Sequence, residues 1–297
     1  MSSPDERLPP AHLLLVLLLC AGWGGNFLAA AVALEALPPF LCTGLRLGIV
    51  LLCLFPSLRP VPRGQRARLA AVALSNGALH FALVFWALSA ARDLSSVAVA
   101  LQTYVPMSAL LGVLLLGERP GVREGVGIGL AFAGVVIVRF DPLVLDAPGA
   151  LGLTLSAAFM LALGTTLMRG LRGVGVLALQ AWTALIGCPF LLGLSALLER
   201  DQLARLAAAE PRHWVALAYT ALVASLLCHG MLYWLVQRHP VARVTPWLLL
   251  VPVIAGALDL LVRGNRPGPE LLIGGATVLL GVLTVALPRP HAAPPRA

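Results

Sequence analysis

The sequence contains no lysine, and charged residues of both signs make up only 11% of its 297 positions. A soluble globular protein carries roughly a quarter charged residues, because its surface must stay hydrated. Hydrophobic residues instead make up 59% of the chain, and the mean hydropathy is +0.92. This composition excludes a soluble fold and, with its long apolar runs, predicts an all-α protein embedded in a lipid bilayer.

The sequence also lacks the patterns typical of enzymes and metal sites. It contains no HExxH, no GxSxG and no GxxxxGK[ST] segment. The cysteines all lie inside apolar runs, with no zinc-site or redox spacing: Cys20, Cys42, Cys53, Cys188 and Cys228. We therefore predict no enzymatic activity, no cofactor and no bound metal.

Apolar runs long enough to cross a bilayer fill most of the chain. We predict ten spans, near 12–32, 38–58, 67–90, 94–117, 122–139, 149–169, 175–197, 213–236, 241–262 and 269–287. The first run exceeds the h-region of a cleaved signal peptide, so we interpret it as a span. Residues 1–11 are then a cytoplasmic N-terminus, and the Pro/Ala-rich tail 288–297 is expected to be disordered.

The net charge of +8 comes from arginines that lie mostly at the ends of apolar runs. This placement favours membrane topology over a nucleic-acid partner. With both termini inside, the cytoplasmic loops carry more arginines than the outer loops. We therefore predict a multi-pass protein of the bacterial inner (plasma) membrane with both termini cytoplasmic, surrounded by lipid.

The chain repeats itself. LLLGERP at 114–120 recurs as LLVRGNRP at 260–267, and Gly127 and Gly134 recur as Gly274 and Gly281. His80 recurs at a similar offset as His229. We infer two five-helix halves, 12–141 and 149–287. Because five is odd, the second half enters the membrane in the opposite sense, and such inverted repeats are a signature of secondary transporters.

Several segments resemble one known family. WGGNF at 23–27, LPPFLCTGLR at 37–46, LLLGERP at 114–120 and PVARVTPWLLLVPVIAGALDLL at 240–261 resemble the EamA branch of the drug/metabolite transporter superfamily. The resemblance covers nearly the whole chain and implies a ten-helix inverted-repeat fold that exports or exchanges amino acids, related metabolites or toxic compounds. Members are commonly driven by the proton gradient. The sequence departs from the family pattern at Phe159-Met160, Asp259 and Gly264-Asn265.

Arg46 is the most distinctive polar residue, because it lies well inside the second span. A charge at this depth is costly and tends to face a cavity or a partner. One interpretation is that Arg46 holds a substrate carboxylate by a bidentate contact. The other is that it extends to the nearer interface or binds backbone carbonyls. The sequence leaves both open.

His229 and Asp259 are candidates for proton coupling, because a histidine or a desolvated carboxyl can titrate near neutral pH. Asp259 lies four residues before Arg263, and an ordinary helix-end carboxylate paired with that arginine is the favoured interpretation. His80 and His229 form either a functional pair or a structural one that satisfies helix carbonyls. Glu118 is interpreted as a local cap or ion pair at the membrane surface.

Neutral polar and aromatic residues complete the predicted substrate site. The fourth and ninth spans contain Pro106, Pro246 and Pro252, and interrupted helices in corresponding positions point to a binding path. The candidate substrate-binding residues, besides Arg46, are Trp23, Asn26, His80, Gln102, Tyr104, Gln180, Trp182, Tyr233 and Trp247. Each also has a structural interpretation as a helix contact or an interfacial anchor.

The sequence thus favours a secondary transporter that exports a small amino-acid-like or other organic metabolite by alternating access, with proton coupling as a hypothesis. The alternative is a non-transporting membrane scaffold or assembly protein. The identity of the substrate stays open at this point, and so does the choice between a monomer and a homodimer.

Overall fold

The computed structural model describes residues 8–90, 100–118, 121–138, 148–263 and 269–286, and these residues form helices and turns with no strand among them. Six helical runs in the described part are long and apolar enough to cross a membrane. They are α1 (Pro10–Ala36), α2 with a short extension (Pro39–Ser57), Arg63–Ala87, Gly149–Arg169, α9 (Val176–Leu198) and Pro211–Arg238. The prediction of an all-helical, multi-pass membrane protein is confirmed.

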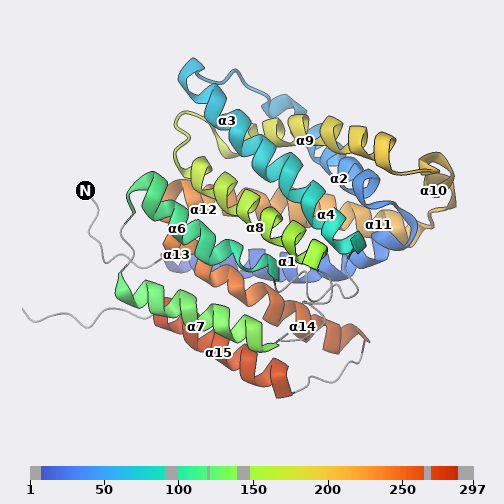
Figure 1. The fold of residues 1–297 in the computed structure, drawn as a ribbon. Coiled ribbons are helices and arrows are strands. Elements are labelled where there is room, and N and C mark those ends of the chain that lie inside the picture. Colours follow the sequence, from blue (N-terminus) through green and yellow to red (C-terminus); the bar gives the residue numbers. More distant parts are fainter. Residues whose placement is uncertain (1–7, 91–99, 119–120, 139–147, 264–268, 287–297) are drawn as a thin grey trace, which may run out of the picture.

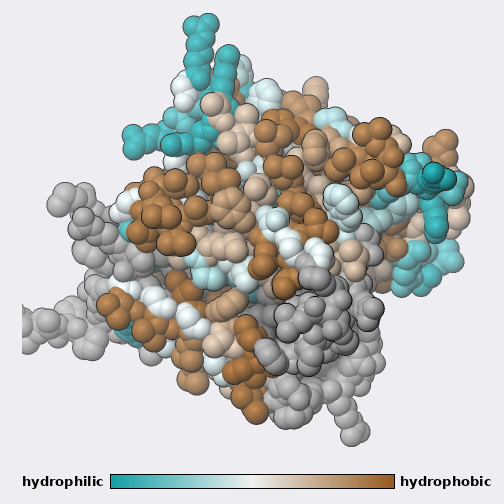
Figure 2. Space-filling view, viewed as in Figure 1, coloured by the Kyte–Doolittle hydropathy of each residue, from teal (hydrophilic) through white to brown (hydrophobic). Residues whose placement is uncertain are grey.

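The surface agrees with a lipid environment. Figure 2 shows broad hydrophobic areas across the middle of the molecule and hydrophilic groups gathered toward its extremities. Large apolar side chains such as Leu52, Leu114 and Leu197 are more than half exposed. In water such contiguous apolar surface would promote association, whereas in a bilayer it contacts acyl chains.

The other four predicted spans correspond to helices outside these six runs. They are α6 (Tyr104–Leu116), α7 (Val122–Val138), α14 (Leu250–Arg263) preceded by α13 (Val241–Val244) and η6 (Thr245–Leu249), and α15 (Pro269–Ala286). The structure therefore supports the helical class, and the count of exactly ten spans stays a prediction.

The predicted interruptions are confirmed. A turn at Gln102–Thr103 precedes α6, and a 3₁₀ segment, η6, separates α13 from α14. Pro106, Pro246 and Pro252 each occupy a position in the first turn of the helix that follows. Backbone N–H groups in the first turn have no intrahelical acceptor, so a proline fits there without loss of a hydrogen bond.

Equivalent helices of the two halves make equivalent contacts. The helix α7 packs on α15, side by side at the lower edge of Figure 1, and α2 packs on α9. In addition, α1 packs on α14, on α11 (Pro211–Tyr219) and on α12 (His229–Arg238). Correspondingly, α8 (Pro148–Arg169) packs on α6, on α3 (Arg66–Val72) and on α4 (His80–Ala90). Exchanging the halves maps this set of contacts onto itself, as an internal two-fold relation requires.

Candidate functional site

Two π-helical segments lie at corresponding places in the two halves. The segment η3 (Ala73–Leu79) joins α3 (Arg66–Val72) to α4, and η5 (Thr220–Cys228) joins α11 to α12 (His229–Arg238). Each π-helical segment ends directly before a histidine, His80 or His229. Such widened turns are uncommon and occur frequently at functional sites.

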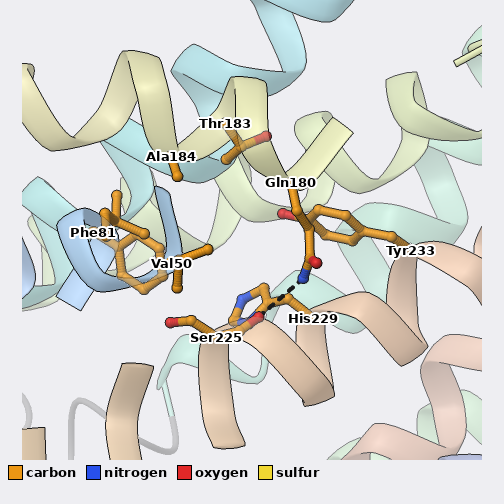
Figure 3. A pocket seen from close by; sticks show the side chains of 9 residues that line it. Val50, Phe81, Gln180, Thr183, Ala184, Ser225, His229 and Tyr233 are labelled. Carbon is orange, nitrogen blue, oxygen red and sulfur yellow. Dashed lines mark hydrogen bonds between the residues drawn. The ribbon is translucent and has the colours of Figure 1, made fainter. Parts of the chain in front are cut away.

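A small cavity lies where the halves meet (Figure 3). It is lined by α2, α4, α9, η5 and α12, through Leu47, Val50, Phe81, Gln180, Thr183, Ala184, Ser225, His229 and Tyr233. Its volume, counted as space for the centre of a water-sized sphere, is about 20 Å³. One water molecule needs roughly 10–15 Å³ on this measure, so the cavity is far smaller than an amino acid.

Arg46 lies beside this cavity. Its side chain is 4% exposed, its Nε donates to the hydroxyl of Ser225, and its guanidinium carbon lies 5.0 Å from the centre of the Phe81 ring. Within the described residues, no carboxylate forms an ion pair with Arg46. An unpaired buried cation is costly in a membrane interior, and such a group tends to face a cavity or a partner.

His229 lines the cavity among aromatic rings. Its Nδ1 lies 2.8 Å from the carbonyl oxygen of Ala224, and its ring lies 5.0 Å from Trp23 and 5.9 Å from Tyr233, centre to centre. Because a carbonyl only accepts, the proton of the neutral imidazole belongs on Nδ1. Nε2 then carries the one ring lone pair that can accept a proton or a ligand N–H.

His80 occupies the corresponding place in the first half but has different contacts. It is buried, and its Nδ1 lies 3.0 Å from the carbonyl oxygen of Ala157 in α8. It does not line the cavity. The structure therefore places His80 as a link between α4 and α8, and only His229 at the cavity.

Buried amide groups add hydrogen-bonding capacity. The side-chain N–H₂ of Gln180 donates to the carbonyls of Ser225 and Leu226, at 3.0 and 2.9 Å. Its Oε1 is buried without a hydrogen-bond partner among the described residues. Tyr233 lies beside Asn76 and Thr183. An unpaired buried acceptor costs about 1–3 kcal/mol, which a ligand N–H at the cavity would recover.

The other predicted residues are spread around the cavity or away from it. Trp23 donates its Nε1–H to the carbonyl of Ala224, 3.1 Å away, and its ring packs edge-on against the ring of His229. Trp182 donates to the carbonyl of Arg59 near one end of the helices. Gln102 and Tyr104 are buried at the start of α6, outside the cavity lining.

Three predicted residues remain. Asn26 is half-buried in α1 with an unpaired Oδ1, and Trp247 in η6 packs against the main apolar cluster. Asp259 belongs to α14, but its side chain is outside the described residues. None of the cavity-lining residues comes from α6, η6 or α14, so the predicted role of the interrupted spans as the path is not tested by this cavity.

Sequence reasoning missed Phe81, Thr183 and Ser225. Ser225 precedes His229 by four residues, but it lies inside the π-helical segment η5, where α-helical spacing does not assign a face. The π-helical segments had no sequence signal that we can identify. They shift the register by one residue, so face assignments across them fail when they assume regular α-helix.

The bundle of apolar spans and the two related halves, with a buried polar site between them, define a multi-pass membrane protein. The sequence profile of the EamA-like transporter family matches twice, at residues 11–140 and 148–287. The chain belongs to the EamA-like transporter family. It is a membrane transporter and not an enzyme, and the alternative of a non-transporting scaffold is set aside.

Individual relatives agree with this assignment. A Salmonella typhimurium protein named "Probable amino-acid metabolite efflux pump" is 31% identical over 278 residues, covering 90% of this chain and 92% of the relative. A protein of the same name from Escherichia coli K12 is 29% identical, with the same coverage. The "Uncharacterized inner membrane transporter YedA" of Escherichia coli K12 is 24% identical, covering 89% of this chain and 85% of the relative.

The fold is also similar to that of a solved structure. A crystal structure superposes with a TM-score of 0.76 at 18% identity, covering 93% of this chain and 96% of that one. At this identity the similarity supports the fold alone.

Proposed function

We propose that the protein exports a small amino-acid-like metabolite from a bacterium, across the inner membrane and by alternating access between two inverted five-helix halves. In this proposal both termini are cytoplasmic and the substrate is held at the cavity between α2, α4, α9, η5 and α12. Relatives named as amino-acid metabolite efflux pumps and as an inner membrane transporter support the substrate class, the direction and the location.

The unpaired Arg46 carries this proposal. A substrate carboxylate at Arg46 supplies the anionic partner that the described chain does not provide. The unpaired Oε1 of Gln180 is an acceptor for a substrate ammonium or amide group. Phe81, His229 and Tyr233 provide the apolar and aromatic walls that organic ligands require.

The size of the cavity supports alternating access. A space for about one water cannot hold an amino acid, so substrate entry requires the halves to move apart. The equivalent contacts of the two halves provide two related packings, one open to each side.

His229 is the proposed proton carrier, with Asp259 as the second candidate. The free Nε2 of His229 accepts either a proton or an N–H of the substrate. Because the two compete for one lone pair, proton binding and substrate binding exclude each other. Mutually exclusive binding to one alternating site produces antiport of protons against substrate.

A ligand screen tests the proposed substrate class. Purified protein is heated with amino acids, their methyl esters and common organic cations, and the unfolding midpoint is recorded. A ligand at 100 times its dissociation constant adds about 2.7 kcal/mol of stability. We expect acids to raise the midpoint and the matching esters to have little effect. Stabilisation by cations alone contradicts the proposal.

Proteoliposomes test the coupling. Export of a ligand identified by the screen is measured with and without an imposed pH gradient. We expect the gradient to accelerate flux in the native protein, and His229→Gln to retain exchange without acceleration. Flux that ignores the gradient in the native protein overturns proton antiport.

A further inference from the structure

The end of α6 positions a buried carboxylate. Gly117 has φ +66°, the Gly117 N–H donates to the Val113 carbonyl at 3.2 Å, and the Glu118 N–H donates to the Gly112 carbonyl at 3.1 Å. The bond from Gly117 to Val113 is that of the αL helix cap, in which glycine supplies the left-handed residue. It turns the chain back, so that a Cβ added at Gly112 would lie 2.8 Å from Glu118 Oε2. Both glycines therefore fix where the Glu118 carboxylate lies.

Both partners of this carboxylate belong to the other half of the protein. Glu118 Oε1 lies 2.8 Å from Nε of Arg169, the last residue of α8, and accepts the Val241 N–H at 3.3 Å. Arg169 in turn donates to the carbonyl of Val236 in α12. One carboxylate thus connects the end of α6 with the ends of α8, α12 and α13, and the local pairing expected from the sequence is a contact between the halves.

A second contact between the halves lies at the same end. His12 in α1 is hydrogen-bonded to His239 after α12, with 2.8 Å between Nδ1 and Nε2, and it packs edge-on against Trp234. Arg169 acts electrostatically on His239, which places the two contacts close together. We call this region the Glu118 end of the molecule.

The opposite end is joined differently. The α1 helix runs 27 residues from near His12 to near Glu35, about 40 Å, so these residues mark opposite ends. There Glu35 pairs with Arg212 at 3.2 Å, but their side chains are 49% and 59% exposed. The side chain of Glu118, in contrast, is only 10% exposed. Ion pairs between exposed side chains, such as Glu35 and Arg212, contribute little stability. The Glu118 end therefore has the stronger ion pair.

We propose that Glu118 is a latch that keeps the Glu118 end of the transporter closed, by holding α8, α12 and α13 of the second half against α6 of the first. Release of this carboxylate lets these helices separate and opens the central cavity on that side. The proposal rests on alternating access as proposed above, and it adds that one named contact biases which side is closed.

Hydrogen exchange measured by mass spectrometry on the full chain in lipid nanodiscs tests the latch without any substrate. In Glu118→Gln we expect about tenfold faster exchange, not only at Gly112–Glu118 and Val241 but also around His12 and Trp234, which Glu118 does not touch. Segments at the opposite end, such as Phe40–Leu41, keep their native exchange. Arg169→Gln reproduces the pattern, and the double variant adds little to either single variant.

Glu199→Gln is the matched control. Glu199 also caps backbone N–H groups across the halves, those of Phe40 and Leu41 at 2.6 and 2.9 Å, but at the opposite end. We expect this variant to accelerate exchange near Phe40 and to leave the Glu118 end unchanged. If Glu118→Gln accelerates exchange only at Glu118 and Val241, Glu118 is a local cap and the latch is overturned. Equal acceleration of exchange at both ends of the molecule also overturns the latch. Because no transported molecule is involved, these outcomes are independent of the substrate assays.

Discussion

Replacing Arg46 with methionine separates a substrate-binding arginine from a structural one. The substitution keeps most of the side-chain volume and removes a cation that no described carboxylate pairs with. It loses one hydrogen bond to Ser225, about 1 kcal/mol, and it relieves the desolvation penalty of a buried charge, which is several kcal/mol. We therefore expect Arg46→Met to raise stability by about 1–3 kcal/mol.

The same substitution weakens substrate binding. Hydrogen bonds to charged groups contribute about 1.5–3 kcal/mol, and a loss of about 2 kcal/mol corresponds to about 30-fold in the dissociation constant. We expect this loss for a carboxylate ligand and almost none for its methyl ester. Arg46→Lys is the control, because it keeps the charge without the bidentate geometry and should lie between the native protein and Arg46→Met.

Two assays check this pair of expectations. Unfolding midpoints are measured without ligand, and calorimetry gives the dissociation constants of the acid and its ester. If Arg46→Met lowers the midpoint and leaves the preference for the acid intact, Arg46 is a structural residue and the reasoning is refuted.

Two further predictions concern packing and pH. A Cβ at Gly134 would lie 2.5 Å from the backbone nitrogen of Val278, so Gly134→Ala should force α7 and α15 apart and cost about 1–3 kcal/mol, whereas Gly125→Ala, with no atom within 4 Å, should not. Unfolding midpoints of the two variants check this, and equal midpoints contradict it. Burial lowers the pKa of His239, and so do its neighbour His12 and the arginines Arg243, Arg169 and Arg238. Because the unfolded chain then binds the proton more readily, this contribution to stability is present above about pH 6.5 and is lost as the pH falls below it. We expect His239→Gln to show a smaller drop in midpoint between pH 7.5 and 5.5, and an unchanged drop contradicts the assignment.

The helices and their interruptions were predictable because they follow from local chemistry. Apolar runs are long enough to cross a bilayer, and prolines mark first turns where no N–H partner is needed. The repeated LLLGERP segment and the matched histidines also predicted two related halves. These signals are local or periodic, so a single sequence contains them.

The details of the site were less predictable because they depend on which face each side chain occupies. Gln180 and Thr183 are three residues apart and line the cavity together, whereas Trp182 lies between them on another face and bonds to Arg59. The contact of Glu118 with Arg169 joins residues from different halves, which no local pattern shows. Arg46 was singled out as unusual from the sequence, but only the three-dimensional structure shows that no carboxylate among the described residues pairs with it.

Counterflow in proteoliposomes tests the central claim most directly. Vesicles loaded with an unlabelled amino acid that stabilises the protein are placed in the same labelled compound below its dissociation constant, and uptake of label is followed for the native protein, Arg46→Met and Arg212→Met, which changes an exposed arginine away from the cavity. The account predicts rapid exchange in the native protein and in Arg212→Met, and exchange that is about 30-fold slower in Arg46→Met at the same ligand concentration. Undiminished exchange by well-folded Arg46→Met would contradict a carboxylate site at Arg46.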